Sequence, residues 1–328
     1  MITFDKIKLV TKLEYLKITD INIFEKRESA KNKSTTFVFN QSKPYSLFIH
    51  LTPDLNKAVI EFTGKILLDN YVQLISFETI NQCLLNINYL GFCRLQIENI
   101  INDSEVVKCD ITKDIELIFK SDIKKVLISQ LSNQKKYITR KYSTTGYTVT
   151  KDVKTKKSQL RLSLYDKYRE MQKADNSEYL KYISEPEAVM DYFRNKYRIE
   201  VNLITKEQIR KYLRIADNTL VNALKSNSNP LKEIFNQIFE CNLKDITGEP
   251  KTRNLYDYES LTQLKDGLIV KACDNDLNKV HNVLDHYLAT NTNKRKYNAR
   301  FRKLLNESNP INENKFIIKH IRDQLIAS

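Results

Sequence analysis

The sequence predicts an α+β fold: an antiparallel-rich central sheet with one face on the core and one polar, candidate catalytic face, followed by a helical C-terminal region. Within the first 205 residues, several segments alternate apolar and polar side chains with the two-residue period of a half-buried strand. After residue 205, apolar residues recur at the three- and four-residue spacings of amphipathic helices. Since 41% of the 328 residues are hydrophobic, the chain can bury a core in two domains, predicted at residues 1–205 and 206–328.

Seven strands and two helices are predicted before residue 205. Alternation and β-branched or aromatic composition predict strands at residues 3–10, 46–52, 57–64, 95–101, 106–119, 160–165 and 198–204. One helix is predicted over 77–90, where Gly91 ends it in a left-handed conformation, and another over 122–133, which begins near Asp122. The polar segment 143–159 is predicted to form a flexible basic loop or a hairpin.

The helical pattern after residue 205 occurs in two places. The first group of apolar residues at helical spacing comprises Ile209, Tyr212, Leu213, Leu220, Ala223 and Leu224. The second comprises Tyr297, Phe301, Leu304 and Leu305, and lysine and arginine side chains occupy the opposite face of that helix. A basic helix face of this kind is either solvated or in contact with DNA.

The charge of the chain points to a polyanionic partner. The net charge is +14 and the pI about 9.3, and residues 120–173 contain fifteen lysines and arginines against four acids. Tyrosines 137, 142 and 147 lie in the same window, and the combination of cations with aromatic rings suits phosphate contacts and base stacking. We therefore expect a nucleic acid partner, although an AT-rich genome also increases the lysine content.

Several classes of protein are disfavoured by what the sequence lacks. It has no apolar run long enough to span a membrane and no secretory signal, so we expect no membrane association and a cytoplasmic location. The five cysteines form no C-x-x-C pair and are expected to be buried free thiols. There is no phosphate-binding G-x-x-x-x-G-K-[ST] motif, so any ATP-driven unwinding requires a partner helicase. No His-x-His pair is present as a metal-binding unit.

Acidic residues occupy the polar side of three predicted strands. Glu61, Asp110 and Glu200 each alternate with apolar neighbours, and Asp114 and Glu116 share the face of Asp110. Each of these acids alone is most simply a solvated residue. If three of them converge, they form an oxygen site suited to Mg²⁺ or Mn²⁺. A tyrosine beside such a site could attack a phosphodiester, and Tyr165 ends the polar row of the strand 160–165.

Four segments resemble, in their order and their pattern of residue types, the gene II/X-type replication initiators of filamentous phages and related plasmids. They are "VIEFTGKIL" (59–67), "KCDITKDIEL" (108–117), "RLSLYDKYREM" (161–171) and "YRIEVNLITKEQIRKYL" (197–213). The resemblance covers roughly residues 57–215. It implies a rolling-circle initiator that nicks one strand at an origin through a covalent phosphotyrosine and later rejoins it. The expected partners are origin DNA, single-stranded or supercoiled, and a host helicase.

The resemblance also implies roles for single residues. The family's nucleophile matches Tyr165, its nearby lysine matches Lys167, and its glutamate matches Glu170. Its strand acids match Glu61, Asp110 and Glu200, which are the expected ligands of Mg²⁺ or Mn²⁺. Further candidates for the site are Asp114, Glu116, Tyr168 and Lys65. Independently of the resemblance, the basic window 120–173 gives Lys154, Lys156, Lys157 and Arg161 as the expected DNA contacts. In this interpretation residues 1–205 form the nicking domain, and residues 206–328 form a DNA-binding or accessory domain.

A noncatalytic DNA-binding protein, such as a repressor, is the alternative. Residues 206–225 have the apolar spacing of two consecutive helices, as in a helix-turn-helix, although ordinary helix packing explains the same pattern. The two hypotheses differ in chemistry, because only a nickase forms a covalent adduct with DNA.

Overall fold

The chain divides into two compact units. One comprises Met1–Glu240 and Ile317–Ser328, and the other comprises Cys241–Phe316. The computed structural model describes residues 2–29, 34–117, 126–127, 137–142, 144–151 and 160–239, and further residues 266, 269, 272–273, 277–287, 294–297, 299–301 and 313–326. The first unit extends past residue 205, and the functional boundary expected there stays a prediction.

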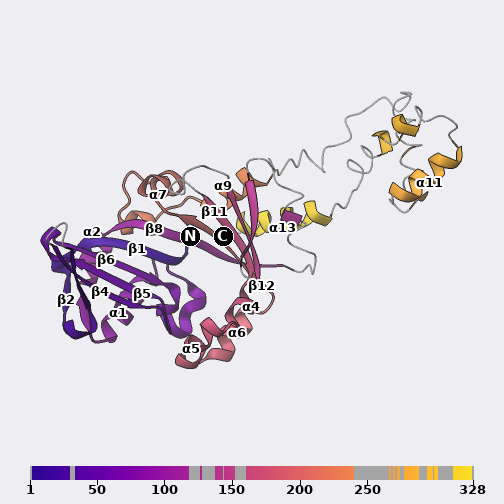
Figure 1. Ribbon diagram of the computed structural model, residues 1–328. Coiled ribbons are helices and arrows are strands. Elements are labelled where there is room, and N and C mark those ends of the chain that lie inside the picture. The colour runs from indigo at the N-terminus through magenta and orange to yellow at the C-terminus, as the bar shows by residue number, and fades with distance from the viewer. Residues whose placement is uncertain are drawn as a thin grey trace. The chain divides into compact units, whose positions relative to one another are not determined.

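A large antiparallel sheet forms the centre of the first unit (Figure 1). Among the described residues it has ten strands in the order β3-β4-β5-β6-β1-β8-β12-β11-β10-β9, and every neighbouring pair is antiparallel. In chain order these strands are β1 (Phe4–Lys12), β3 (Glu25–Ser29), β4 (Ser34–Gln41), β5 (Leu47–Thr52), β6 (Lys57–Thr63), β8 (Glu105–Glu116), β9 (Tyr137–Tyr142), β10 (Gly146–Lys151), β11 (Arg161–Asp166) and β12 (Lys196–Leu203). Strands β2 (Leu16–Ile18) and β7 (Cys93–Leu95) pair separately.

Helices lie between the strands and after the last of them. Those of the first unit are α1 (Ile80–Tyr89), α2 (Ile97–Asp103), α4 (Lys167–Met171), α5 (Ala174–Tyr182), α6 (Pro186–Phe193), α7 (Lys206–Leu213), α8 (Leu220–Leu224) and α9 (Pro230–Ile238). Helix α13 (Glu313–Ile326) extends into the same unit. Short 3₁₀ turns occur at η1 (Leu13–Tyr15), η2 (Ile21–Ile23), η3 (Pro53–Leu55) and η4 (Gly64–Gln73). No helix in the described part of the chain is long and apolar enough to cross a membrane.

Side-chain alternation gives the sheet one apolar and one polar face. On β1 and β6, residues such as Leu9 and Ile60 are fully buried, whereas Lys8 and Glu61 on the opposite face are partly exposed. Burial of these aliphatic side chains supplies the main stabilisation of the sheet, at about 1.5–3 kcal/mol for each fully buried residue. The polar face is the one that the acidic residues share.

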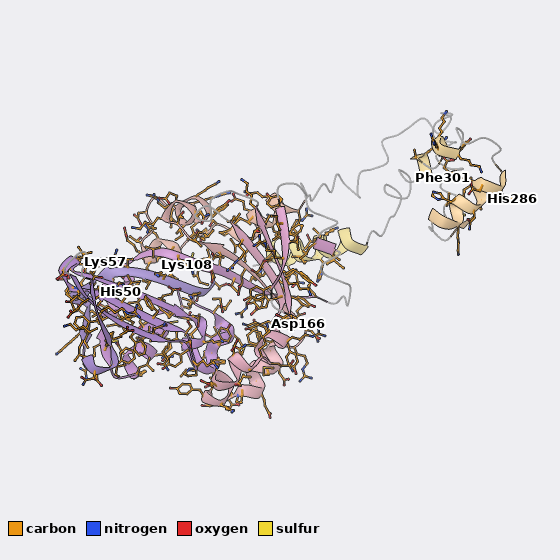
Figure 2. All side chains as sticks on the ribbon, in the orientation of Figure 1. His50, Lys57, Lys108, Asp166, His286 and Phe301 are labelled. Carbon is orange, nitrogen blue, oxygen red and sulfur yellow. The ribbon has the colours of Figure 1, made fainter. Side chains whose placement is uncertain are left out.

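Local sequence signals explain where the helices begin and end. Asp166, at the end of β11 (Figure 2), accepts a hydrogen bond from the backbone N–H of Arg169 at 2.9 Å and so caps α4. The Thr205 hydroxyl caps α7 in the same way, 3.2 Å from the backbone N–H of Gln208. Gly91 follows α1 with φ of +84°, which confirms its expected role in ending that helix.

Six of the predicted strands are confirmed: they correspond to β1, β5, β6, β8, β11 and β12. The strand predicted over 95–101 is wrong, because Ile97–Asp103 form helix α2 after the short strand β7. The spacing of Ile97, Ile100 and Ile101 fits a helical period, and Ile100 is fully buried. Most of the helix predicted over 122–133 lies outside the described residues.

Four strands of the large sheet were not predicted as such. Strands β3 and β4 pair with each other at one edge of the sheet, and β9 and β10 form a hairpin at the other. Residues 146–151 of the basic segment 143–159 form strand β10 of that hairpin, and residues 152–159 lie outside the described residues. Edge strands carry polar residues on both faces and therefore lack a clear alternation.

The second unit contains α11 (Leu277–Tyr287) and a small apolar cluster of its own. The buried residues of this cluster are Cys273, Val280, Leu284 and Phe301, and Tyr297 packs against them. The helical spacing of Tyr297 and Phe301 therefore reflects an apolar contact. The four described cysteines, Cys83, Cys93, Cys109 and Cys273, are buried free thiols, as predicted.

Candidate active site

Tyr165 lies near the end of β11 on the polar face of the sheet. Its side chain is 2% exposed, and its hydroxyl donates a hydrogen bond to Oε1 of Glu200 at 2.6 Å. Burial, and then the nearby Glu200 charge, raise the pKa of the tyrosine well above its usual value. The phenol is therefore protonated at neutral pH, and its proton is directed at the carboxyl group of Glu200.

A glycine on the neighbouring strand makes room for Tyr165. Gly146 of β10 is the register partner of Tyr165, and a Cβ atom added at Gly146 would overlap the Cα and Cβ atoms of the tyrosine. On the next strand, Tyr142 stacks on the tyrosine with ring centroids 4.5 Å apart and an interplanar angle of 21°. The stacked ring and the glycine together fix the plane of the Tyr165 ring.

Lys167 follows Tyr165 by two residues and begins helix α4. Its side chain is almost fully buried, its Nζ lies 2.7 Å from Oε2 of Glu170, and the same atom lies 5.7 Å from the centre of the Tyr165 ring. Burial opposes ionisation of Glu170, but Lys167 and the amide of Asn176 outweigh it and lower the pKa of Glu170 to about 2. The pair is therefore an ion pair across the neutral pH range.

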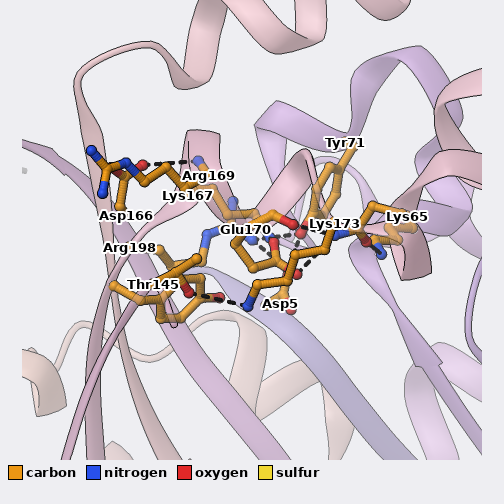
Figure 3. A network of polar contacts seen from close by, with 12 residues as sticks. Asp5, Lys65, Tyr71, Thr145, Asp166, Lys167, Arg169, Glu170, Lys173 and Arg198 are labelled. Carbon is orange, nitrogen blue, oxygen red and sulfur yellow. Dashed lines mark hydrogen bonds and ion pairs between the residues drawn. The ribbon is translucent and has the colours of Figure 1, made fainter. Parts of the chain in front are cut away.

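A second lysine, the half-buried Lys65, joins this network from η4, directly after β6 (Figure 3). Its ammonium group donates to the side chain of Asn176, and the amide nitrogen of Asn176 donates to Oε1 of Glu170 at 3.0 Å. Burial and the nearby Lys167 lower the pKa of Lys65. Glu170 thus binds Lys167 directly and is linked to Lys65 through Asn176.

Arg198 holds two aspartates together beneath the site. The guanidinium group is fully buried and binds both oxygens of Asp114, at 2.7 and 2.9 Å, while its third nitrogen donates to Asp5 at 2.6 Å. Tyr71 donates to the same Asp5 oxygen at 2.8 Å (Figure 3). Burial opposes ionisation of Asp5, but Arg198 and Lys167 outweigh it and lower the pKa of this carboxyl.

At two other carboxyl groups of the site, burial outweighs the effect of the neighbouring cations, and the pKa is raised. Burial, followed by the charge of Asp5, raises the pKa of Glu200 to about 8. Burial also raises the pKa of Asp110, which accepts a hydrogen bond from the amide of Asn202. A carboxyl group whose pKa is near neutrality and which already accepts a bond from a phenol is suited to take up its proton.

These groups line one pocket on the polar face. Of the predicted residues it contains Lys65, Asp110, Arg161, Tyr165, Lys167, Glu170 and Glu200. Asp5, Tyr71 and Tyr142 line the same pocket and were not predicted as site residues. The strand register explains the grouping, because β8, β12, β11 and β10 are consecutive in the sheet.

Glu61 shares the polar face but does not line the pocket. It pairs with Lys8, which pairs with Lys108, whereas Glu200 pairs with Thr112. Glu61 and Glu200 are thus separated by three strand spacings and four residues, or about 20 Å between backbones. Within the described residues no three histidine, cysteine, aspartate or glutamate side chains are arranged to hold a metal ion. The expected convergence of Glu61, Asp110 and Glu200 is therefore not formed in this structure.

The remaining candidates lie elsewhere. Asp114 is bound to Arg198, and the exposed Glu116 uses its backbone N–H to bind Gln324 of α13 at 2.8 Å. Tyr168 packs against an apolar cluster that includes Met171 and Phe193, and it does not line the pocket. The predicted DNA contacts Lys154, Lys156 and Lys157 lie outside the described residues.

A family model for the N-terminal region of the gene II replication-associated protein matches the chain over residues 52–222. This segment includes β6, β8, β11 and β12, and thus most of the pocket. No curated protein and no solved structure matches the chain. The match spans more than half of the sequence, so the chain belongs to the gene II-type family of phage replication-associated proteins.

Proposed function

We propose that this replication-associated protein nicks one DNA strand at a replication origin, with Tyr165 as the nucleophile, and later rejoins it. The observation that carries the proposal is the hydrogen bond of 2.6 Å from the Tyr165 hydroxyl to Glu200, inside a pocket that the buried Lys167 and the half-buried Lys65 also line. A nucleophile, a proton acceptor and cations for a phosphate are thus next to one another.

In the proposed reaction, Glu200 accepts the phenolic proton while the tyrosine oxygen attacks the phosphorus of a DNA phosphodiester. One oxygen–phosphorus bond forms, and the bond from phosphorus to the 3′-oxygen breaks, with solvent supplying the proton for that oxygen. DNA synthesis extends a 3′-hydroxyl, so this polarity leaves a primer and a 5′-phosphotyrosine. The covalent bond conserves the energy needed for rejoining.

Lys167 and Lys65 are the residues proposed to stabilise the negative charge that develops on the phosphate. The Lys167–Glu170 ion pair holds one ammonium group in place before the DNA binds, so little reorganisation is needed during the reaction. Arg161 lines the same pocket and is proposed to contact an adjacent phosphate.

A divalent cation, Mg²⁺ or Mn²⁺, stays part of the proposal. Of the three predicted ligands, Asp110 and Glu200 line the pocket. Burial raises the pKa of Asp110, and a bound cation would favour the ionised form of this carboxyl. When bound, the cation would polarise the phosphoryl oxygen.

The repressor-like alternative relies on residues 206–225. In the structure these residues form α7 and α8, and their apolar residues Ile209, Leu213, Leu220 and Leu224 are buried in the first unit. Packing therefore accounts for the helical spacing. A DNA-binding protein without catalysis has no need for a buried tyrosine directed at a carboxylate, and so the geometry favours nicking.

The test uses single-stranded oligonucleotides from the host replicon, labelled and incubated with Mg²⁺ or Mn²⁺. We expect a protease-sensitive covalent adduct on a denaturing gel, and mass spectrometry should map it to the Tyr165 peptide. Tyr165→Phe should abolish the adduct while DNA affinity stays nearly unchanged, and Tyr168→Phe, as the matched control, should retain it. An adduct on Tyr168, or full cleavage by Tyr165→Phe, would contradict the proposal.

A further inference from the structure

Three lysines surround one glutamate on the polar face of the sheet, outside the pocket. The Nζ atoms of Lys6, Lys8 and Lys108 lie 2.7, 3.0 and 3.8 Å from the carboxylate of Glu61. Burial opposes ionisation of Glu61, but the bonds from Lys6 and Lys8 outweigh it and lower the pKa of this carboxyl. One negative charge thus positions three positive ones, and the cluster keeps a surplus of two.

The lysine cluster begins at the edge of the pocket. Lys6 pairs with Thr63 on one side and with Asp110 on the other, and both partners line the pocket. Lys8 and Lys108 occupy the next row, about 7 Å further along the strands. The side chains of the three lysines are 28–35% exposed, so their ammonium groups are accessible from solvent.

Two aromatic rings continue this surface on strand β5. Phe48 pairs in register with Glu61, its ring lies 5.5 Å from Nζ of Lys8, and the ring of His50 is 6.3 Å away. Both rings are partly exposed. Burial lowers the pKa of His50, and the positive charges of Arg27, Lys8 and Lys57 lower it further, which indicates a positive local potential (Figure 2).

We propose that Lys6, Lys8, Lys108, Phe48 and His50 form a binding track for single-stranded DNA that leads away from the pocket. The lysines contact successive phosphates, and the rings stack with bases, which is the combination that sequence-tolerant single-strand binding uses. Glu61 acts as a positioning residue that keeps the lysines extended over the sheet. The DNA bound on this track is the single strand on one side of the phosphate that is cut. The inference therefore rests on the proposed function.

The test measures binding without catalysis, in the full chain with Tyr165→Phe. Fluorescence anisotropy with a 20-nucleotide single strand is recorded across a range of NaCl concentrations. On a plot of log affinity against log salt concentration, each phosphate contact contributes about 0.7 to the slope. Replacing Lys6, Lys8 and Lys108 with glutamine removes three contacts and should make the slope less steep by about 2. At 0.1 M salt this corresponds to an affinity about a hundred-fold weaker. The matched control replaces the exposed Lys17, Lys26 and Lys181 and should change the slope little.

A second variant guards against misfolding. Adding Glu61→Gln to the lysine variant removes the carboxylate that would otherwise lack its partners, and the loss of affinity should persist. Glu61→Gln alone should strengthen binding, up to about five-fold, because it frees the lysines from their ion pairs. An unchanged salt slope in both lysine variants, or equal losses in the control, would overturn the track.

These outcomes are independent of the nicking proposal. If Tyr165 forms no adduct but the lysine variants lose single-strand affinity, the proposed function fails and the track stands. If the lysine variants bind normally and the parent chain forms the adduct, only the track fails. A metal-ligand role for Glu61 predicts the opposite result for Glu61→Gln, namely loss of the adduct at unchanged affinity.

Discussion

Replacing Glu200 with glutamine tests the chemistry of the pocket most directly. Glutamine has nearly the same size and keeps an oxygen that can accept the bond of 2.6 Å from Tyr165, but it cannot take up the phenolic proton. If Glu200 is the general base, the rate of adduct formation should fall by roughly 10²–10⁴-fold. Affinity for single-stranded DNA should change little, because the proton moves only during the reaction.

The pH dependence gives a second and sharper signature. Burial raises the pKa of Glu200 to about 8, and only the ionised form can accept a proton. At pH 7 roughly a tenth of the molecules are then competent, so the rate should rise about tenfold for each pH unit below 8 and level off above it. In Glu200→Gln this dependence should disappear.

The assay is single-turnover adduct formation with excess enzyme, quenched at intervals and resolved on denaturing gels from about pH 6 to 9.5 at constant ionic strength. A parent rate that is flat across this range, or a Glu200→Gln rate within about threefold of the parent, would refute the assignment of Glu200 as the base. A circular dichroism spectrum of the variant should match that of the parent.

The same substitution has a predictable effect on stability. The folded-state pKa of Glu200 lies above the ordinary value of 4.5, so its favourable contribution is complete below pH 4.5 and is lost as the pH rises through about 8. The loss amounts to at most about 5 kcal/mol for a shift of this size. Urea denaturation should therefore show Glu200→Gln gaining stability relative to the parent between about pH 5 and pH 8.5, and a constant difference would contradict the raised pKa.

Two further predictions concern the surroundings of Tyr165 and the cation. Gly146→Ala should cost about 1–3 kcal/mol in the free energy of unfolding and abolish the adduct, because the added Cβ displaces β11; a normal urea midpoint with normal adduct yield would refute this. Chelation of divalent cations should stop adduct formation without weakening single-strand binding, and Mg²⁺ or Mn²⁺ should restore it; an undiminished adduct in chelator would show that no such cation is required.

The central strands could be predicted because each has one face in the core. Alternation located β1, β5, β6, β8, β11 and β12, whereas the strands β3, β4, β9 and β10 near the two edges have no continuous apolar side to reveal them. Helix α2 was mistaken for a strand because its short apolar run matches both periods until its tertiary contacts are known.

The sequence predicted which face of the sheet each candidate residue occupies, but not how close together these residues lie. Alternation placed Glu61, Asp110 and Glu200 on one side of the sheet, as the register confirms. Which of them lie close together depends on strand order and register, which single segments do not encode. Arg198 also belonged to the polar face by alternation, but nothing in the sequence near it identified Asp5 and Asp114 as its partners.

Asp5 shows how a local irregularity can conceal a site residue, and it provides the final prediction. In the two-residue alternation of β1, Asp5 should share the core face with the buried Ile7 and Leu9. The register between β1 and β8, however, shifts between Phe4 and Lys6. This bulge inserts one extra residue and lets Asp5 line the pocket instead.

Because the Asp5 charge is the largest contribution after burial to the raised pKa of Glu200, Asp5→Asn should move the midpoint of the pH–rate profile below about 8. Arg198 keeps both of its bonds to Asp114, so the fold should survive the change. A midpoint that stays in place or moves upward in the single-turnover assay would mean that the charge of Asp5 does not raise the pKa of Glu200.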